Sequence, residues 1–153
     1  MAEIELAYDL VGTRLVAIGS ATLSYDRLGS RPRRLGDLAL EYDRAGSRLR
    51  MIGGYAVEYD RWGSRPSALG GWQLAYDRLG SRLRRLGPQE LTYGMLGSRV
   101  ETVGPVALRY DRLGSRVKHL DLPAGADLTE ELLVVVFFVL YQVEREAARR
   151  RSD

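Results

Sequence analysis

The sequence of 153 residues contains no cysteine and a single histidine, His119. A disulfide framework and a thiolate metal cluster are therefore excluded, and a zinc site would lack ligands. A Ser-His-acid triad could occur only once, and the repeated Gly-Ser pairs lack the strand-turn-helix setting of a nucleophile elbow. We therefore expect no catalytic residues, no metal and no cofactor, which makes an enzyme the weakest of the functional hypotheses.

Long hydrophobic runs are also absent. The longest apolar run, Leu132 to Tyr141, has ten residues, whereas a membrane-spanning helix needs roughly 20. The first residues, Met1 to Glu5, carry two acids and no basic segment, so they do not resemble a secretion signal. These features predict a cytoplasmic protein with one buried helix.

Tyrosines recur every 17 residues without an insertion or deletion, which is the signature of a repeat protein. They are Tyr8, Tyr25, Tyr42, Tyr59, Tyr76, Tyr93 and Tyr110. Seven units with the consensus Leu-x-Tyr-Asp-Arg-Leu-Gly-Ser-Arg thus occupy residues 3–121. The repeats also hold the basic surplus, with 19 Arg or Lys against 14 Asp or Glu in residues 1–121, compared with 4 against 6 in residues 122–153.

Each unit begins with a strand pattern, as in Ile4, Leu6 and Tyr8, whose alternation puts these side chains on one face. An Asp that can bond the backbone follows, and then a glycine that can take positive φ, so each unit is predicted to be a β-hairpin. The glycines are Gly12, Gly29, Gly46, Gly63, Gly80, Gly97 and Gly114.

The return strand of each hairpin departs from plain alternation. Its apolar residues, such as Leu15 and Ile18, are three apart, and a β-bulge would restore the phase. Pro32 and Pro66 occupy the same position as Leu15 in their units, and proline cannot donate to a ladder. We therefore expect one local break in each return strand, with this position outside regular pairing.

The last part of the chain predicts a helix. Asp127 and Glu130 have the spacing of a capping box. The run from Leu132 to Tyr141 has no polar stripe, so the helix must be surrounded on all sides. Its valines make a strand the local alternative, but residues 144–151 continue in helix formers. We expect a single domain over residues 1–153, with a linker at 122–127 and a central helix with a basic tail at 128–151.

The two parts of the chain fit one another. Seven hairpins with short links predict an antiparallel meander, and closure removes the open edges that the first and last units do nothing to protect. An eight-stranded barrel is filled by its own side chains, whereas 16 to 18 strands leave a channel. The predicted fold is therefore mainly β, a closed antiparallel barrel of about 12–14 short strands around one C-terminal hydrophobic helix.

This order of elements resembles the Tubby-like superfamily, which includes the Tubby C-terminal domain, the LURP-one-related proteins and the phospholipid scramblases. Short hairpins with a Tyr-Asp-x-x-Gly turn are followed by Leu122-Pro123 and the apolar helix. The resemblance implies a barrel of 12 strands around that helix, and binding of anionic headgroups by basic residues on the barrel. The hairpins alone also resemble the YD repeats of Rhs-type shell proteins, which have no partner for the helix.

The recurring acid and arginine of each unit are best interpreted as structural, because a functional site should be singular. We expect each Asp to cap its turn, and each Arg to pair across the hairpin or to lie on a tyrosine ring. They are Asp9, Asp26, Asp43, Asp60, Asp77 and Asp111, with Arg14, Arg31, Arg48, Arg65, Arg82, Arg99 and Arg116. The sixth unit has Gly94 in place of Asp.

Basic residues that vary between the return strands are the candidate site for anionic headgroups. They are Arg33, Arg34, Arg50, Arg84, Arg85 and Lys118. Their uneven distribution over the units predicts a lopsided charge, and a solvated surface is the alternative interpretation. Arg149, Arg150 and Arg151 could also touch anionic lipid.

Two functional hypotheses follow. The first is a non-enzymatic intracellular binding module whose partner is an anionic membrane surface, where it would be peripheral, or another protein. The second is a structural or self-assembling repeat protein without a small-molecule ligand, with Trp62 at a turn tip as a contact; the chain would be a monomer or a homo-oligomer. Nucleic acid is not expected, because that would need a denser basic stripe with stacking aromatics.

Overall fold

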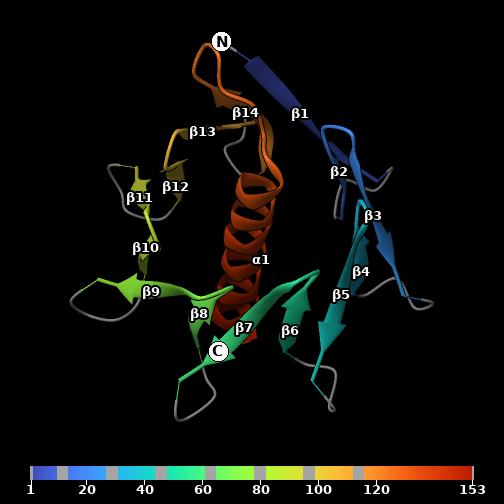
Figure 1. The fold of residues 1–153 in the computed structure, drawn as a ribbon, viewed down its shortest axis with the longest axis vertical. Coiled ribbons are helices and arrows are strands. Elements are labelled where there is room, and N and C mark those ends of the chain that lie inside the picture. The colour runs from blue at the N-terminus through green and yellow to red at the C-terminus, as the bar shows by residue number, and fades with distance from the viewer. Residues whose placement is uncertain are drawn as a thin grey trace.

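The chain forms fourteen short strands and one helix in a computed structural model (Figure 1). The structure describes residues 2–9, 14–26, 31–43, 48–60, 65–77, 82–94, 99–111 and 116–152, with only the backbone described for residues 2 and 143–152. The strands are β1 (Ala2–Tyr8), β2 (Leu15–Ile18), β3 (Ala21–Tyr25), β4 (Pro32–Leu35), β5 (Leu38–Tyr42), β6 (Leu49–Ile52), β7 (Tyr55–Tyr59), β8 (Pro66–Leu69), β9 (Trp72–Tyr76), β10 (Leu83–Leu86), β11 (Gln89–Tyr93), β12 (Val100–Val103), β13 (Val106–Tyr110) and β14 (Val117–Leu122). The helix is α1 (Glu130–Ser152).

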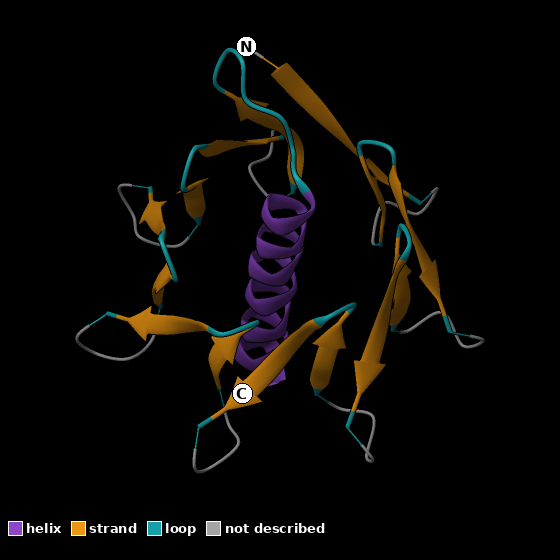
Figure 2. Cartoon of the chain, in the orientation of Figure 1, coloured by secondary structure: helices purple, strands orange, loops and turns teal. Residues whose placement is uncertain are grey.

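The strands form a closed barrel in which each pairs with its neighbours in sequence and β1 pairs with β14. Each unit supplies two antiparallel strands, and the ring of strands encircles α1 (Figure 2). The predicted closed barrel with a C-terminal helix is therefore confirmed. Its fourteen strands are the upper limit of the expected range and exceed the 12 that the Tubby-like resemblance implied.

A β-bulge occurs in each hairpin at the predicted place. In the first unit Ala7 lies opposite Ala17, but Tyr8 lies opposite Leu15, so that Val16 is the extra residue. The same shift recurs in the other six hairpins. Because the extra residue breaks the alternation, apolar residues three apart in sequence share one face of the sheet.

The two prolines lie at the edge of regular pairing rather than outside it. Pro32 and Pro66 are the first residues of β4 and β8, opposite Tyr25 and Tyr59. The expectation that this position is unpaired is therefore wrong. A proline is tolerated as the first residue of a strand, because its missing N–H is not needed there.

The hairpins are joined at one end of the barrel by two-residue turns, each of which begins with a glycine. These turns, at 19–20, 36–37, 53–54, 70–71, 87–88 and 104–105, define the glycine-turn end. Gly87 has φ of +58°, and a Cβ there would lie 2.6 Å from Cγ of Trp72. Glycine is thus required at position 87 for two reasons: the backbone has a positive φ, and the side chain of Trp72 leaves no space for a Cβ. We call the opposite end, where β1 and the other odd-numbered strands finish at tyrosine, the Tyr-Asp end. The turn glycines that the sequence predicts at this end lie outside the described residues.

The helix fills the barrel. Val134 to Val139 are each at most 3% exposed, and six consecutive residues cover the whole circumference of a helix. They form one core with the inward residues of the strands. The inward residues include Leu6, Ile18, Leu35, Leu49, Ile52, Leu69, Leu86, Val103 and Leu120. The prediction that the apolar helix is surrounded on all sides is confirmed, which excludes the strand alternative for this segment.

The helix runs from the glycine-turn end to the Tyr-Asp end. At its start, Glu130 accepts a hydrogen bond of 3.4 Å from the hydroxyl of Tyr55, the first residue of β7. Farther along, Tyr141 lies close enough to Tyr42 to help raise its pKa. The helix begins two residues later than predicted because Thr129, and not Asp127, accepts the capping hydrogen bond, from the N–H of Leu132 at 3.2 Å.

The joint that closes the barrel has a longer ladder than the others. Four residue pairs join β1 to β14, whereas two join each of the other pairs of successive hairpins. The side chain of Arg109 donates to Glu3 and lies 3.0 Å from Asp121. The first and last units thus make additional contacts at the closing joint, where no covalent link joins the strands. The repeat pattern of the sequence did not predict these contacts.

We expect Arg109→Ala to lower the free energy of unfolding by about 1 kcal/mol, because it removes the ion pair with Glu3 across the closing joint and the ion pair with Asp121 within the last hairpin. Arg85→Ala is the matched control, since Arg85 is similarly exposed but pairs with Glu90, within a covalently linked part of the ring. Urea unfolding of both variants measures the difference. Equal losses would contradict a special role for the closing joint.

Candidate functional site

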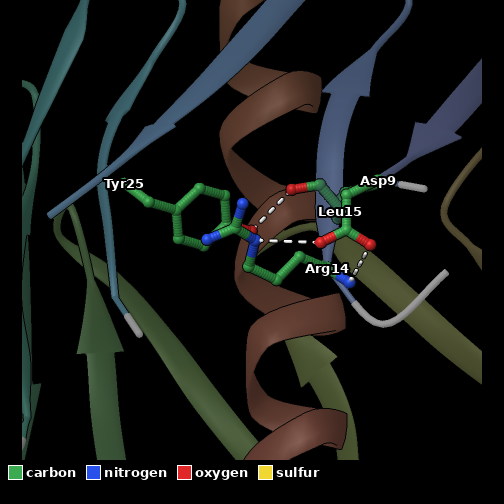
Figure 3. Close-up of polar contacts among 4 residues, drawn as sticks. All are labelled: Asp9, Arg14, Leu15 and Tyr25. Carbon is green, nitrogen blue, oxygen red and sulfur yellow. Dashed lines mark hydrogen bonds and ion pairs between the residues drawn. The ribbon is translucent and has the colours of Figure 1, made fainter. Parts of the chain in front are cut away.

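The repeated Asp, Arg and Tyr make one joint between each hairpin and the next. In the first unit, Nε of Arg14 lies 3.2 Å from Oδ2 of Asp9, and its guanidinium lies 4.4 Å from the centre of the Tyr25 ring (Figure 3). The hydroxyl of Tyr25 donates to the carbonyl of Leu15 at 2.5 Å. Arginine is therefore held between the acid of its own unit and the ring of the following unit.

The joint recurs all around the barrel. The Arg-to-ring distances are between 4.2 and 5.0 Å in all seven places. Arg116 lies over Tyr8, and Tyr8 donates to the carbonyl of Val117, so the last unit meets the first in the same way. The hydroxyl of Tyr42 donates a hydrogen bond to the carbonyl of Pro32, and that of Tyr76 donates one to the carbonyl of Pro66. The structural interpretation of the repeated Asp and Arg is supported by these contacts.

The tyrosines of the joint are poor candidates for proton transfer. Burial raises the pKa of Tyr42 well above its usual range, and burial also raises the pKa of Tyr110. A phenol with a raised pKa stays protonated at neutral pH and continues to donate its hydrogen bond. Tyr42 and Tyr110 therefore hold their units together as hydrogen-bond donors to the carbonyls of Pro32 and Val100.

In the sixth unit, a different acid lies near the place of the missing Asp. A Cβ at Gly94 would lie 3.3 Å from Oε2 of Glu101, so this carboxylate occupies the region where the other units have Asp. Glu101 and Arg99 both act on Tyr110, whose pKa the former raises and the latter lowers, after the larger effect of burial. Glu101 is seven residues after Gly94 in the sequence, and the repeat pattern did not predict that its carboxylate lies near the place of the missing Asp.

The six predicted basic residues do not form one patch, and the structure divides them into two sets. Arg33, Arg50, Arg84 and Lys118 each occupy the bulge position, directly after the residue whose carbonyl accepts the tyrosine hydroxyl. Arg34 and Arg85 lie one residue farther along, toward the middle of the outer wall. We call the bulge positions the rim row: Val16, Arg33, Arg50, Ser67, Arg84, Glu101 and Lys118.

The rim row lies at one level of the barrel. Because the same contacts recur at all seven joints, including the closing one, successive units are related by rotation about the barrel axis. Equivalent positions then lie in one plane across that axis. The four cations fall on β4, β6, β10 and β14, so they are spread around the Tyr-Asp end at unequal intervals.

The two wall arginines are engaged with neighbours on the side of the glycine-turn end. Arg34 donates to the carbonyl of Asp37 at 3.1 Å. Arg85 pairs with Glu90 at 3.4 Å. In the rim row, Arg33, Arg50 and Arg84 are exposed and Lys118 is half-buried.

The opposite end of the barrel is acidic. Asp37, Asp127, Glu130 and Glu131 are all exposed there. The pKa of Tyr55 at this end is raised by burial and then by the carboxylates of Glu130 and Glu131. Within the described part of the chain, the rim-row cations and these exposed carboxylates therefore lie at opposite ends of the barrel. This arrangement could not be predicted from the sequence, because the sequence leaves the direction of the helix in the barrel open.

The remaining candidates are placed as follows. His119 lies in the closing joint, 3.7 Å from Glu3, which agrees with a structural role. Among the described residues, no group of three His, Asp or Glu is arranged to hold a metal ion. Trp62 and the side chains of Arg149, Arg150 and Arg151 lie outside the described residues.

Comparison with protein-family models, with curated proteins and with solved structures found no match. The resemblance to Tubby-like domains and to YD repeats therefore stays a prediction. Within the described part of the chain, no helix combines the length and the apolar character needed to cross a membrane.

We expect Gly94→Asp to destabilise the protein by about 1 kcal/mol, because the new carboxylate would face that of Glu101 at close range. In the double variant Gly94→Asp/Glu101→Ala, the Asp joint of the other units is rebuilt and the loss should disappear. Urea unfolding of both single variants and the double variant completes the cycle. If the changes in the free energy of unfolding of the two single variants simply add in the double variant, the two carboxylates do not interact, which would contradict this prediction.

Proposed function

We propose that the protein is a non-enzymatic binding module whose rim row contacts anionic lipid headgroups at a cytoplasmic membrane surface. The observation that carries the proposal is the placement of four cations, Arg33, Arg50, Arg84 and Lys118, at one level around the Tyr-Asp end. Each basic residue near an anionic membrane contributes about 1 kcal/mol of attraction. Four such contacts are enough for reversible binding.

The axial separation of charge supports the same function. An anionic surface attracts the Tyr-Asp end and repels the glycine-turn end, where Asp127, Glu130 and Glu131 are exposed. The protein would therefore approach with one end first. The sequence Arg149-Arg150-Arg151 belongs to the last turns of α1, which runs toward the Tyr-Asp end.

The wall arginines contribute less in this proposal. The guanidiniums of Arg34 and Arg85 already have partners in the carbonyl of Asp37 and the carboxylate of Glu90. The charge of Arg85 is therefore partly compensated. The candidate site proposed from the sequence is thereby reduced from six residues to the four of the rim row.

The binding test compares two double variants that remove the same charge from the same two strands. We expect Arg33→Ala/Arg84→Ala to bind about 30-fold more weakly to vesicles of phosphatidylserine and phosphatidylcholine, since two contacts of about 1 kcal/mol are lost. Arg34→Ala/Arg85→Ala should bind nearly as the unchanged protein does. Co-sedimentation with the vesicles measures both.

Vesicles of phosphatidylcholine alone serve as the neutral control, and circular dichroism checks that each variant is folded. Equal partitioning into neutral and anionic vesicles would exclude the lipid function. Equal losses from the rim and wall variants would exclude the rim row as the contact surface, because a diffuse attraction does not distinguish the two sets.

A second candidate is a self-assembling repeat protein, which the opposite charges of the two ends favour. The acidic end of one copy could meet the basic end of another, and such a head-to-tail contact would continue into a filament. Size-exclusion chromatography with light scattering tests it. A mass that stays that of one chain at high protein concentration would exclude this function.

A further inference from the structure

We propose that the partner of the rim row is the plane of an anionic bilayer, met with the barrel axis along the membrane normal. This inference rests on the proposed lipid function and makes it more specific. A module that holds one headgroup in a pocket needs its cations together, whereas a module that meets a plane needs them apart and level. The rim row has the second arrangement.

The spacing of the cations follows from the order of the strands. Arg33 and Arg50 are on β4 and β6, two strands apart, whereas the intervals from β6 to β10, from β10 to β14 and from β14 around to β4 are each four strands. With about 4.8 Å between neighbouring strands, these intervals are at least ~10 Å and ~19 Å along the wall. A phosphate oxygen accepts hydrogen bonds at about 2.8 Å, so each cation meets a separate headgroup.

The acidic end does not oppose this orientation. From Glu130 to Gln142 the helix rises about 18 Å, at 1.5 Å per residue. This is more than twice the Debye length of about 8 Å at physiological ionic strength. The carboxylates of Glu130 and Glu131 are therefore screened from a membrane that contacts the Tyr-Asp end.

The repeat itself offers a test by gain of binding. Ser67 follows Pro66 in the fourth unit as Arg33 follows Pro32 in the second, and both lie at the bulge position opposite the end of an odd-numbered strand. Ser67→Arg would therefore put a fifth cation in the rim row, in the wide interval between β6 and β10. Ala17→Arg is the matched control, because residue 17 occupies the wall position of Arg34 and is half-buried like Ser67.

We expect Ser67→Arg to bind vesicles of phosphatidylserine and phosphatidylcholine about five-fold more tightly, and Ala17→Arg to change binding by less than about two-fold. Arg33→Ala and Arg84→Ala, on distant parts of the ring, should each weaken binding by about five-fold, and their effects should multiply. Free glycerophosphoserine, the soluble headgroup, should not displace the protein from the vesicles. Co-sedimentation gives all of these values, and thermal unfolding confirms that each variant is folded.

The inference would be overturned if Ser67→Arg had no effect, or if one arginine carried all the binding and glycerophosphoserine displaced the protein. Those results would indicate a headgroup pocket and would leave the proposed lipid function standing. Failure of the unchanged protein to bind anionic vesicles would remove both. A particle mass that grows with concentration and falls in Arg33→Ala/Arg84→Ala, without vesicle binding, would identify a second copy as the partner and also overturn the inference.

Discussion

The contact on which the structure depends is the guanidinium that each unit places between its own acid and the tyrosine ring of the following unit. A planar arginine can pair with a carboxylate along its edge while its face lies on an aromatic ring, which a lysine cannot do. In the third unit, Nε of Arg48 lies 2.8 Å from Asp43, and the guanidinium lies 4.7 Å from the ring centre of Tyr59. Each contact contributes modestly, but it recurs at all seven joints, including the joint between the last unit and the first.

Closure creates a space that side chains of the strands cannot fill by themselves, and the helix fills it. An apolar helix without a polar face is unstable in water, whereas a wide barrel with an empty interior would lose its core contacts. In this protein Phe138 and the valines around it share one core with the inward residues of all seven hairpins. The barrel and the helix are therefore expected to fold as one cooperative unit, with the closing joint of β1 and β14 as its only junction that no chain link holds.

The same geometry separates the residues that build the fold from those that are free to vary. The positions of the joint and the inward positions are constrained in every unit, because each contacts a neighbouring unit or the helix. The bulge residue is the extra residue of its strand and faces outward, so its side chain has no packing partner that all units share. This explains how Val16, Arg33, Ser67 and Glu101 can occupy equivalent positions. At the sixth joint, where Gly94 replaces Asp, the carboxylate of the rim-row residue Glu101 lies beside the glycine.

Much of this fold could be predicted from the sequence, because its signals are local. The period of Tyr8 and its equivalents determined the hairpins, the spacing of Leu15 and Ile18 determined the bulge, and the apolar run of the helix required a surrounding barrel. The tertiary structure alone decided what depends on distant residues coming together. Arg109 bridges the two ends of the repeat region, and the direction of the helix puts Glu130 and Arg33 at opposite ends. The division of adjacent arginines into a rim row and a wall set also required the structure, because neighbours in sequence differ in level only once the ring has closed.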